Sequence, residues 1–304
     1  MKRKKLLCAV LTSILFFSSY TGITVYAAPG DAPTKTAPAE NAQESQTDEI
    51  STETTKAQST LTDEELAAYY GDSVFIGDSI MVGFRNYSAK QETFVHDIQF
   101  LAVGSYSAFN AMKPVNADNV HPVYKGKKSQ LWDAVPLIGS KRAFILLGMN
   151  DISILGLEGA RDQYKELIDK ILETSPDIEI HIISVTYTLA GQGVGKLNNE
   201  NLAKYNVLLK EMAEENGWGY LDLCTPISDG KGNLAKEYCS DGFVHLSTSA
   251  YTLWESELID YANAQAKQAE DETETQSETQ NDSQSKMETI LEANPSQNTK
   301  GRNQ

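Results

Sequence analysis

The first apolar run after a polar amino-terminal region reads Val74-Phe75-Ile76-Gly77-Asp78-Ser79-Ile80. Its apolar part predicts a short buried strand, and Gly-Asp-Ser predicts the turn at the end of that strand. In open α/β sheets, ligands bind beside the carboxyl ends of the strands. The pattern therefore predicts that the Ser79 hydroxyl lies at this edge. A serine in that position becomes a nucleophile when a base lies beside it, although a serine at a strand–helix turn can also be a simple helix cap.

A second compact motif, Asp241-Gly242-Phe243-Val244-His245, lies late in the chain. An early serine followed by a late Asp–His pair is one order in which a hydrolytic triad can be assembled. His245 is therefore the candidate base. The alternative is a purely structural histidine, and His96, His121 and His181 compete for the catalytic role. The position of His181 inside a predicted strand favours a structural role.

Strand-like and helix-like patterns alternate between the two motifs and beyond the second. Short apolar runs predict strands at residues 74–76, 99–103, 143–147, 178–186 and 218–223. Helical periodicity or capping residues predict helices that begin near Ile80 and that cover 129–138, 159–173, 200–216 and 247–263. Five strands separated by helices indicate an α/β fold with a parallel sheet covered on both faces.

Stabilisation of a tetrahedral oxyanion needs N–H donors near the nucleophile. Gly104 ends the second predicted strand, where a residue without a side chain allows close approach to the backbone N–H. Gly148-Met149-Asn150-Asp151 follows the third apolar run, and the Asn150 amide can donate into the same crevice. Each position also has a structural reading, a tight turn for Gly104 and helix capping for Asn150 and Asp151.

Two long irregular segments follow strands and are therefore expected to border the same edge. They cover Ser105–Lys128 and Leu189–Asn198, and the second contains Gly191, Gly193 and Gly195. The glycine-rich segment could form a mobile flap, but a plain surface loop is the simpler interpretation.

The ends of the chain differ in composition from its centre. Residues 1–28 combine a basic start, an apolar stretch and small residues, which predicts a cleaved signal peptide rather than an uncleaved anchor, and hence a secreted protein loosely retained at most. Residues 29–60 and 266–304 lack aromatic residues and are rich in polar ones, which predicts a disordered linker and a disordered acidic tail. Residues 61–265 are then one folded domain.

The 304-residue chain has a formal net charge of −16 at pH 7. A surface of that sign repels phosphate backbones, so nucleic acid is not an expected partner. Lys125-Gly126-Lys127-Lys128 is the one basic cluster outside the amino terminus and is interpreted as a solvated loop. After signal removal no stable membrane insertion is expected. The sequence leaves the oligomeric state open.

Two cysteines, Cys224 and Cys239, remain after the signal region. In an exported protein they can form a disulfide, and two free thiols are nearly as good an interpretation. Their spacing does not match a metal site, and no His/Cys cluster indicates zinc.

Together, Gly77-Asp78-Ser79, Gly104, Gly148-x-Asn150-Asp151 and the segment from Asp241 to His245 resemble the four sequence blocks of the SGNH/GDSL hydrolases. The resemblance implies a flavodoxin-like three-layer α/β/α sandwich that hydrolyses esters without a metal or an organic cofactor. It implies that Ser79 is the nucleophile and His245 the base. The oxyanion hole would combine the N–H groups of Ser79 and Gly104 with the Asn150 amide.

One feature departs from the family pattern. The family usually spaces its acid and base as Asp-x-x-His, whereas here Asp241 precedes His245 by four residues and Gly242 occupies the expected acid position. Asp241 is the preferred orienter of the imidazole, because a loop can absorb one extra residue at Gly242. The alternatives are a backbone carbonyl or another acid such as Glu237, which would leave a Ser–His dyad.

The favoured function is an exported carboxylic ester hydrolase that acts through an acyl-enzyme on Ser79, with O-acyl or O-acetyl groups of glycans as a suggested substrate. Two alternatives remain open on the sequence alone. An acyltransferase would share the acyl-enzyme and pass the acyl group to a sugar hydroxyl. A binding module would retain the fold without catalysis, and the altered spacing of the acid is the observation in its favour.

Overall fold

The computed structural model describes residues 61–293, all of which fall in one compact unit. The predicted signal peptide at 1–28, the predicted linker at 29–60 and residues 294–304 lie outside the described residues.

A five-stranded parallel sheet forms the centre of the fold, with strand order β2-β1-β5-β6-β7. The strands are β1 (Ser73–Gly77), β2 (Gln99–Ala102), β5 (Arg142–Leu146), β6 (Glu179–Ile183) and β7 (Gly219–Leu221). Every neighbouring pair is parallel. The predicted five-stranded flavodoxin-like arrangement is therefore confirmed.

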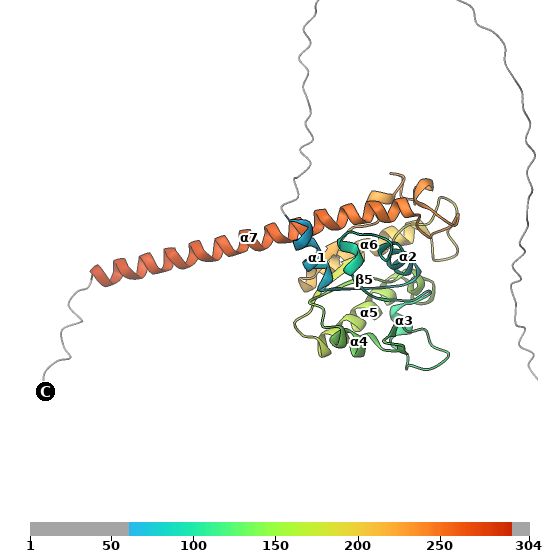
Figure 1. The fold of residues 1–304 in the computed structure, drawn as a ribbon, viewed down its shortest axis with the longest axis horizontal. Helices are drawn as coiled ribbons and strands as arrows, with labels where there is room; N and C mark the ends of the chain where they lie inside the picture. Colours follow the sequence, from blue (N-terminus) through green and yellow to red (C-terminus); the bar gives the residue numbers. More distant parts are fainter. Residues whose placement is uncertain (1–60, 294–304) are drawn as a thin grey trace, which may run out of the picture. The chain divides into compact units, whose positions relative to one another are not determined.

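Helices cover both faces of this sheet, which explains why all five residues of β1 are buried. One layer contains α1 (Asp63–Gly71), α2 (Ser79–Ser88) and α7 (Thr248–Ala293), in which α1 and α2 each contact α7. The other contains α3 (Ala108–Ala111), α4 (Leu131–Ile138), α5 (Met149–Thr174) and α6 (Asn199–Asn216), grouped around α5. In Figure 1, α7 and the α4–α5 pair lie on opposite sides of β5.

The chain enters the sheet at β1, continues to β2 on one side, and crosses to β5 on the other. The carboxyl ends of β1 and β5 therefore flank the point where the strand order reverses, which is where open α/β sheets bind ligands. The turn after β1 carries Ser79, and the turn after β5 carries Asn150.

The long segment after β2 contains more regular structure than the sequence predicted. It includes α3 and a hairpin of β3 (Val123–Tyr124) and β4 (Lys127–Lys128). Lys128 is exposed, and its Nζ donates to the carbonyls of Asn116, Ala117 and Asn119 at 2.9–3.2 Å. Residues 125–128 are all exposed, as the interpretation of a solvated loop predicted. The prediction missed the short hairpin and the contacts of Lys128.

The last helix is longer than the sequence predicted. The pattern placed its end near Asn263 and predicted a disordered tail from residue 266, but α7 continues as one helix to Ala293. The physical reason is that residues 264–293 contain neither glycine nor proline and are rich in Glu, Gln and Ala, which favour helix formation. The helix ends just before Asn294-Pro295, where the proline disfavours a helical residue in front of it.

Side chains of α7 attach it to the elements that carry the candidate site. The Tyr251 hydroxyl donates to the Ile80 carbonyl in α2 at 2.8 Å. The Trp254 Nε1–H group donates to the Leu223 carbonyl, just after β7, at 2.9 Å. Helix α7 therefore connects the first turn of α2 to the segment that follows the edge strand β7. None of the helices in the described part of the chain combines the length and apolar character that crossing a bilayer requires.

Candidate active site

Ser79 is the first residue of α2, directly after β1. Gly77 makes this tight turn possible, because a Cβ there would lie 2.6 Å from the Met81 Cβ and 2.9 Å from the Leu146 carbonyl oxygen. Asp78 then caps the helix by accepting a hydrogen bond from the Ile80 amide at 2.9 Å. The Gly-Asp-Ser sequence thus forms a packed turn that holds Ser79 at the carboxyl edge of the sheet.

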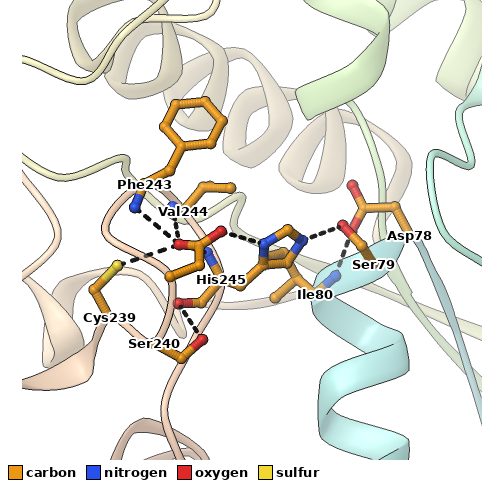
Figure 2. Close-up of polar contacts among 9 residues, drawn as sticks. Asp78, Ser79, Ile80, Cys239, Ser240, Phe243, Val244 and His245 are labelled. Atoms are coloured by element: carbon orange, nitrogen blue, oxygen red, sulfur yellow. Dashed lines mark hydrogen bonds and ion pairs between the residues drawn. The ribbon is translucent and has the colours of Figure 1, made fainter. Parts of the chain in front are cut away.

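His245 reaches this serine from the other end of the domain. Its Nε2 lies 3.0 Å from the Ser79 Oγ, and its Nδ1 lies 2.6 Å from Oδ2 of Asp241. Figure 2 shows the imidazole of His245 between the Ser79 hydroxyl and the carboxylate. The structure therefore brings the three predicted residues into one hydrogen-bonded chain, with the geometry that a serine, a base and an orienting acid need.

The longer spacing between acid and base is accommodated by a turn built on the acid itself. Oδ1 of Asp241 accepts hydrogen bonds from the backbone amides of Phe243, Val244 and His245 at 2.8–3.2 Å (Figure 2). Gly242 has a φ of 77°, a conformation that glycine adopts without strain. One carboxylate oxygen thus fixes the turn, and the other is left to contact the imidazole.

The same contacts set the charge of Asp241. Partial burial by itself would raise the pKa of this carboxyl, but the hydrogen bonds from the His245 ring and from the three amides hold it well below its ordinary value. Asp241 is therefore ionised throughout the neutral range. Glu237, the alternative orienter, contributes its backbone carbonyl to Ser247 and Ser249 instead.

The two backbone N–H groups expected in the oxyanion hole are free to donate a hydrogen bond to a substrate. The amides of Ser79 and Gly104 donate to no other residue within the described range 61–293. A Cβ on Gly104 would meet nothing within 4 Å, and its φ is not in the left-handed region. The fold itself therefore does not require glycine at this position, and the missing side chain leaves room beside the strand end.

Asn150 is held firmly in the first turn of α5. Its Nδ2 donates to Oδ2 of Asp78 at 2.9 Å and to the Tyr106 carbonyl at 3.0 Å. Gly148, which precedes it, has a φ of 126°, and a Cβ there would lie 2.1 Å from the ring of Tyr205. The Gly-x-Asn-Asp segment is thus shaped by close packing against α6, and it directs the amide of Asn150 towards the turn that carries Ser79.

Two buried carboxyl groups support these donors. Asp151 accepts from the Ala108 and Phe109 amides at 3.1 and 2.8 Å, which ties α5 to the first turn of α3. Burial raises the pKa of Asp78 to about 7 and that of Asp151 to about 6, although amide hydrogen bonds act in the opposite direction on both. The sequence pattern contained both aspartates but gave no sign of their partners, which come from other elements.

The competing histidines do not contact Ser79. His181 is buried, stacks on Phe144 and contacts the Tyr261 hydroxyl, so the predicted structural role agrees with its position. His96 is exposed in a short 3-10 helix, η1 (Phe94–Asp97), and His121 is buried in the segment after α3.

Cys224 and Cys239 do not form a disulfide in the structure. Cys224 is buried, and Cys239 is partly exposed with its Sγ 3.5 Å from Oδ1 of Asp241. Of the two interpretations left open, free thiols describe the structure. Within residues 61–293, no group of three or more His, Cys, Asp or Glu side chains is arranged to hold a metal ion.

The buried aspartates make the stability of the protein depend on pH in an unusual direction. Both have a pKa in the folded state above the value near 4 of an unfolded chain, so the folded state binds more protons between these values. Together the two groups should therefore lower the free energy of unfolding by about 6 kcal/mol as the pH rises from about 4 to about 7. Urea denaturation at a series of pH values measures this change. The Asp151→Asn variant should show a shallower decline, and a flat or rising profile in the wild-type protein would contradict the expectation.

A family model described as the GDSL-like lipase/acylhydrolase family matches residues 75–253, more than half of the chain. No curated protein matches this chain.

Several solved structures share the general arrangement at low identity. A GDSL-like lipase of Bacteroides thetaiotaomicron is 16% identical with a TM-score of 0.49, covering 64% of this chain and 88% of its own. A Streptococcus pneumonia protein assigned as a platelet activating factor is 21% identical with a TM-score of 0.47, covering 66% and 92%. A catalytic mutant of an acetylxylan esterase of Geobacillus stearothermophilus is 13% identical with a TM-score of 0.43, covering 62% and 92%. These scores are too low to support an argument about substrate.

The match to the family model covers Ser79, Gly104, Asn150 and the turn from Asp241 to His245. The chain belongs to the GDSL-like lipase/acylhydrolase family, and it is an ester hydrolase of the SGNH type.

Proposed function

We propose that this protein is an exported esterase that removes O-acyl groups from glycans through an acyl-enzyme on Ser79. The observation that carries the proposal is the hydrogen-bonded chain from Ser79 through His245 to Asp241. Export is supported by the pattern of residues 1–28, in which a basic start precedes an apolar stretch and small residues.

In the proposed reaction, the Ser79 Oγ attacks the ester carbonyl carbon while Nε2 of His245 takes the hydroxyl proton. Asp241, ionised and hydrogen-bonded to Nδ1, stabilises the imidazolium that forms. The tetrahedral oxyanion accepts hydrogen bonds from the open N–H groups of Ser79 and Gly104 and from the amide of Asn150.

Collapse of this intermediate breaks the bond to the alcohol, which leaves with the proton carried by His245. A water molecule then attacks the acyl-Ser79 carbonyl with His245 again as the base. The second tetrahedral intermediate breaks down to the carboxylic acid and the free serine. This sequence uses each of the three residues in the same position throughout, so no rearrangement of the chain is needed between the two half-reactions.

A pocket at the same edge of the sheet supports a polar alcohol portion in the substrate. It has a volume of about 610 Å³ and is lined by residues of the segments that follow β6 and β7, among them Leu189 and Glu237. The Leu189 amide donates to the Phe243 carbonyl at 2.8 Å, which joins one wall to the loop of His245. Its volume lies within the range of small-molecule sites.

The lining of this pocket favours a neutral hydroxyl-rich group. Apolar surface comes from Leu189, Ala190, Leu234 and Ala235, and polar groups come from Ser228, Asp229, Lys236 and Glu237. Two acids against one lysine disfavour an anionic headgroup. A sugar offers both apolar C–H faces and hydroxyl groups, which fit this mixture. A simple long acyl chain would lie against polar and charged groups to which it can offer no hydrogen bond.

Replacement of the nucleophile tests the reaction. Ser79→Ala should lower the turnover of p-nitrophenyl acetate by roughly 10⁶-fold, because no other group in the proposed site can form the acyl-enzyme. The assay is paired with circular dichroism to show that the variant folds. A fluorophosphonate probe should label the wild-type protein at Ser79 and leave the variant unlabelled. Hydrolysis by the variant at the wild-type rate would end the proposal.

Replacement of the acid tests the role of Asp241 against the alternative Glu237. Asp241→Asn should lower kcat by roughly 10⁴-fold, because the amide cannot stabilise the imidazolium and favours the wrong tautomer. Glu237→Gln should have a far smaller effect, because the Nδ1 of His245 is already bonded to Asp241. Steady-state kinetics on the same ester compare the two variants. Equal losses in both would show that the orienter has been assigned wrongly.

Filling the pocket tests the substrate. Ala190, exposed at its rim, can be changed to Trp with little cost to folding. Ala190→Trp should raise KM for an acetylated oligosaccharide about 10-fold more than for p-nitrophenyl acetate. The matched control is Ala68→Trp, at an exposed position on α1. An equal change for both esters in Ala190→Trp would argue against a glycan in this pocket.

A further inference from the structure

The Asp78 side chain contacts two groups that belong to different parts of the site. Its Oδ1 accepts from the Ile80 amide at 2.9 Å, and its Oδ2 accepts from Nδ2 of Asn150 at 2.9 Å. The residue is only 1% exposed. The carboxyl group therefore joins the turn that carries the nucleophile to the side chain that faces it from the next strand.

We propose that Asp78 is a positioning residue that fixes the Asn150 amide as an oxyanion donor, with both of its carboxyl oxygens in use. This inference rests on the proposed hydrolysis through Ser79 and adds a role for a residue that does not itself touch the substrate. Its action is exerted through Asn150.

The hydrogen bonds of Asn150 explain why such a residue is needed. The side-chain amide of asparagine carries two N–H hydrogens. Its plane can turn about the Cβ–Cγ bond unless hydrogen bonds hold both hydrogens. One hydrogen is held by Asp78, and the other is donated to the Tyr106 carbonyl at 3.0 Å in the structure. While Asp78 holds the first hydrogen, the plane of the amide stays fixed, and the second hydrogen can pass to the developing oxyanion.

The position of Tyr106 is itself set from α5. Asp151 holds the Ala108 and Phe109 amides, and these lie two and three residues after Tyr106 in the chain. The resting acceptor of the second hydrogen is thus a backbone carbonyl in a loop tied down by a buried carboxyl. Asn150 is therefore oriented from two sides before any substrate arrives, which is the condition for strong stabilisation of a transition state.

The residue type at position 78 follows from this double contact. An asparagine has one acceptor oxygen, so it can satisfy either the Ile80 amide or Asn150 but presents an NH₂ group to the other. A glutamate adds a methylene in a site that is fully buried. Aspartate alone among residues of this size supplies two acceptors on one short side chain, so Asp78→Asn is the informative variant.

The first experiment compares Asp78→Asn, Asn150→Ala and the double variant in ester hydrolysis. Asn150→Ala should lower kcat by about 10²–10³-fold. Asp78→Asn should lower kcat by about 10- to 100-fold with KM changed less than about 2-fold. The double variant should lose no more than Asn150→Ala, because Asp78 acts through the group already removed. Losses that multiply would overturn the proposal, since a merely structural aspartate would act independently of Asn150.

A second readout uses an inhibitor that forms a tetrahedral adduct with the serine. The affinity of a trifluoromethyl ketone should fall in Asp78→Asn by the same factor as kcat/KM, because both report stabilisation of the oxyanion. An unchanged affinity would overturn the proposal. Activity in the wild-type protein together with loss in Ser79→Ala separates failure of this inference from failure of the proposed function.

A third measurement requires no change at Asp78 and covers the case in which Asp78→Asn fails to fold. The side-chain amide resonances of Asn150 are assigned by their loss in Asn150→Ala. In a His245→Gln background they should shift with a midpoint near neutral pH as Asp78 loses its proton. Asp151, His245 and Tyr251 are the titratable groups that interact with Asp78. The background removes His245, and repeating the titration with Asp151→Asn added removes the other group that titrates near this pH. Resonances that stay constant from pH 5 to 9 would contradict the contact.

Discussion

β1 is hydrogen-bonded to β2 along one edge and to β5 along the other, with Gly77 in register with Ala102 and with Leu146. Because all three strands are parallel and in step, the turns that follow them begin at the same level. The nucleophile turn, the Gly104 turn and the Asn150 turn are therefore neighbours as a result of strand pairing alone. The contacts between their side chains refine an arrangement that the sheet has already produced.

The parts of the site that come from strand ends could be predicted from the sequence, because a strand is a local pattern and parallel strands share an edge. Ser79, Gly104 and Asn150 all belong to this group. The turn that brings Asp241 to His245 could be suggested from the sequence, but its geometry could not be worked out. That geometry depends on three backbone amides that one carboxylate oxygen gathers, and on the positive φ of Gly242. Spacing alone does not reveal such a turn.

Other features could not be predicted because they arise from contacts between distant segments. The hydrogen bond from Asn150 to Asp78 joins residues 72 apart, and the one from Phe109 to Asp151 joins residues 42 apart. The length of α7 was missed for a different reason. Its last part lacks the apolar periodicity that indicates a helix packed on a core, so composition suggested disorder where helix propensity and the absence of breakers favour a helix.

Tyr251 lies six residues after His245 in the sequence, in the first two turns of α7, and its hydroxyl holds the Ile80 carbonyl directly beside Ser79. Gly83 permits this contact, because a Cβ there would lie 2.0 Å from the Tyr251 oxygen. The base and the nucleophile are therefore connected in two ways. His245 contacts Ser79 directly, and the chain from His245 to Tyr251 is hydrogen-bonded to Ile80, the residue after Ser79. A displacement of α2 would therefore displace α7 and His245 with it. The distance between Ser79 and His245 is thus insensitive to movements of the surrounding loops.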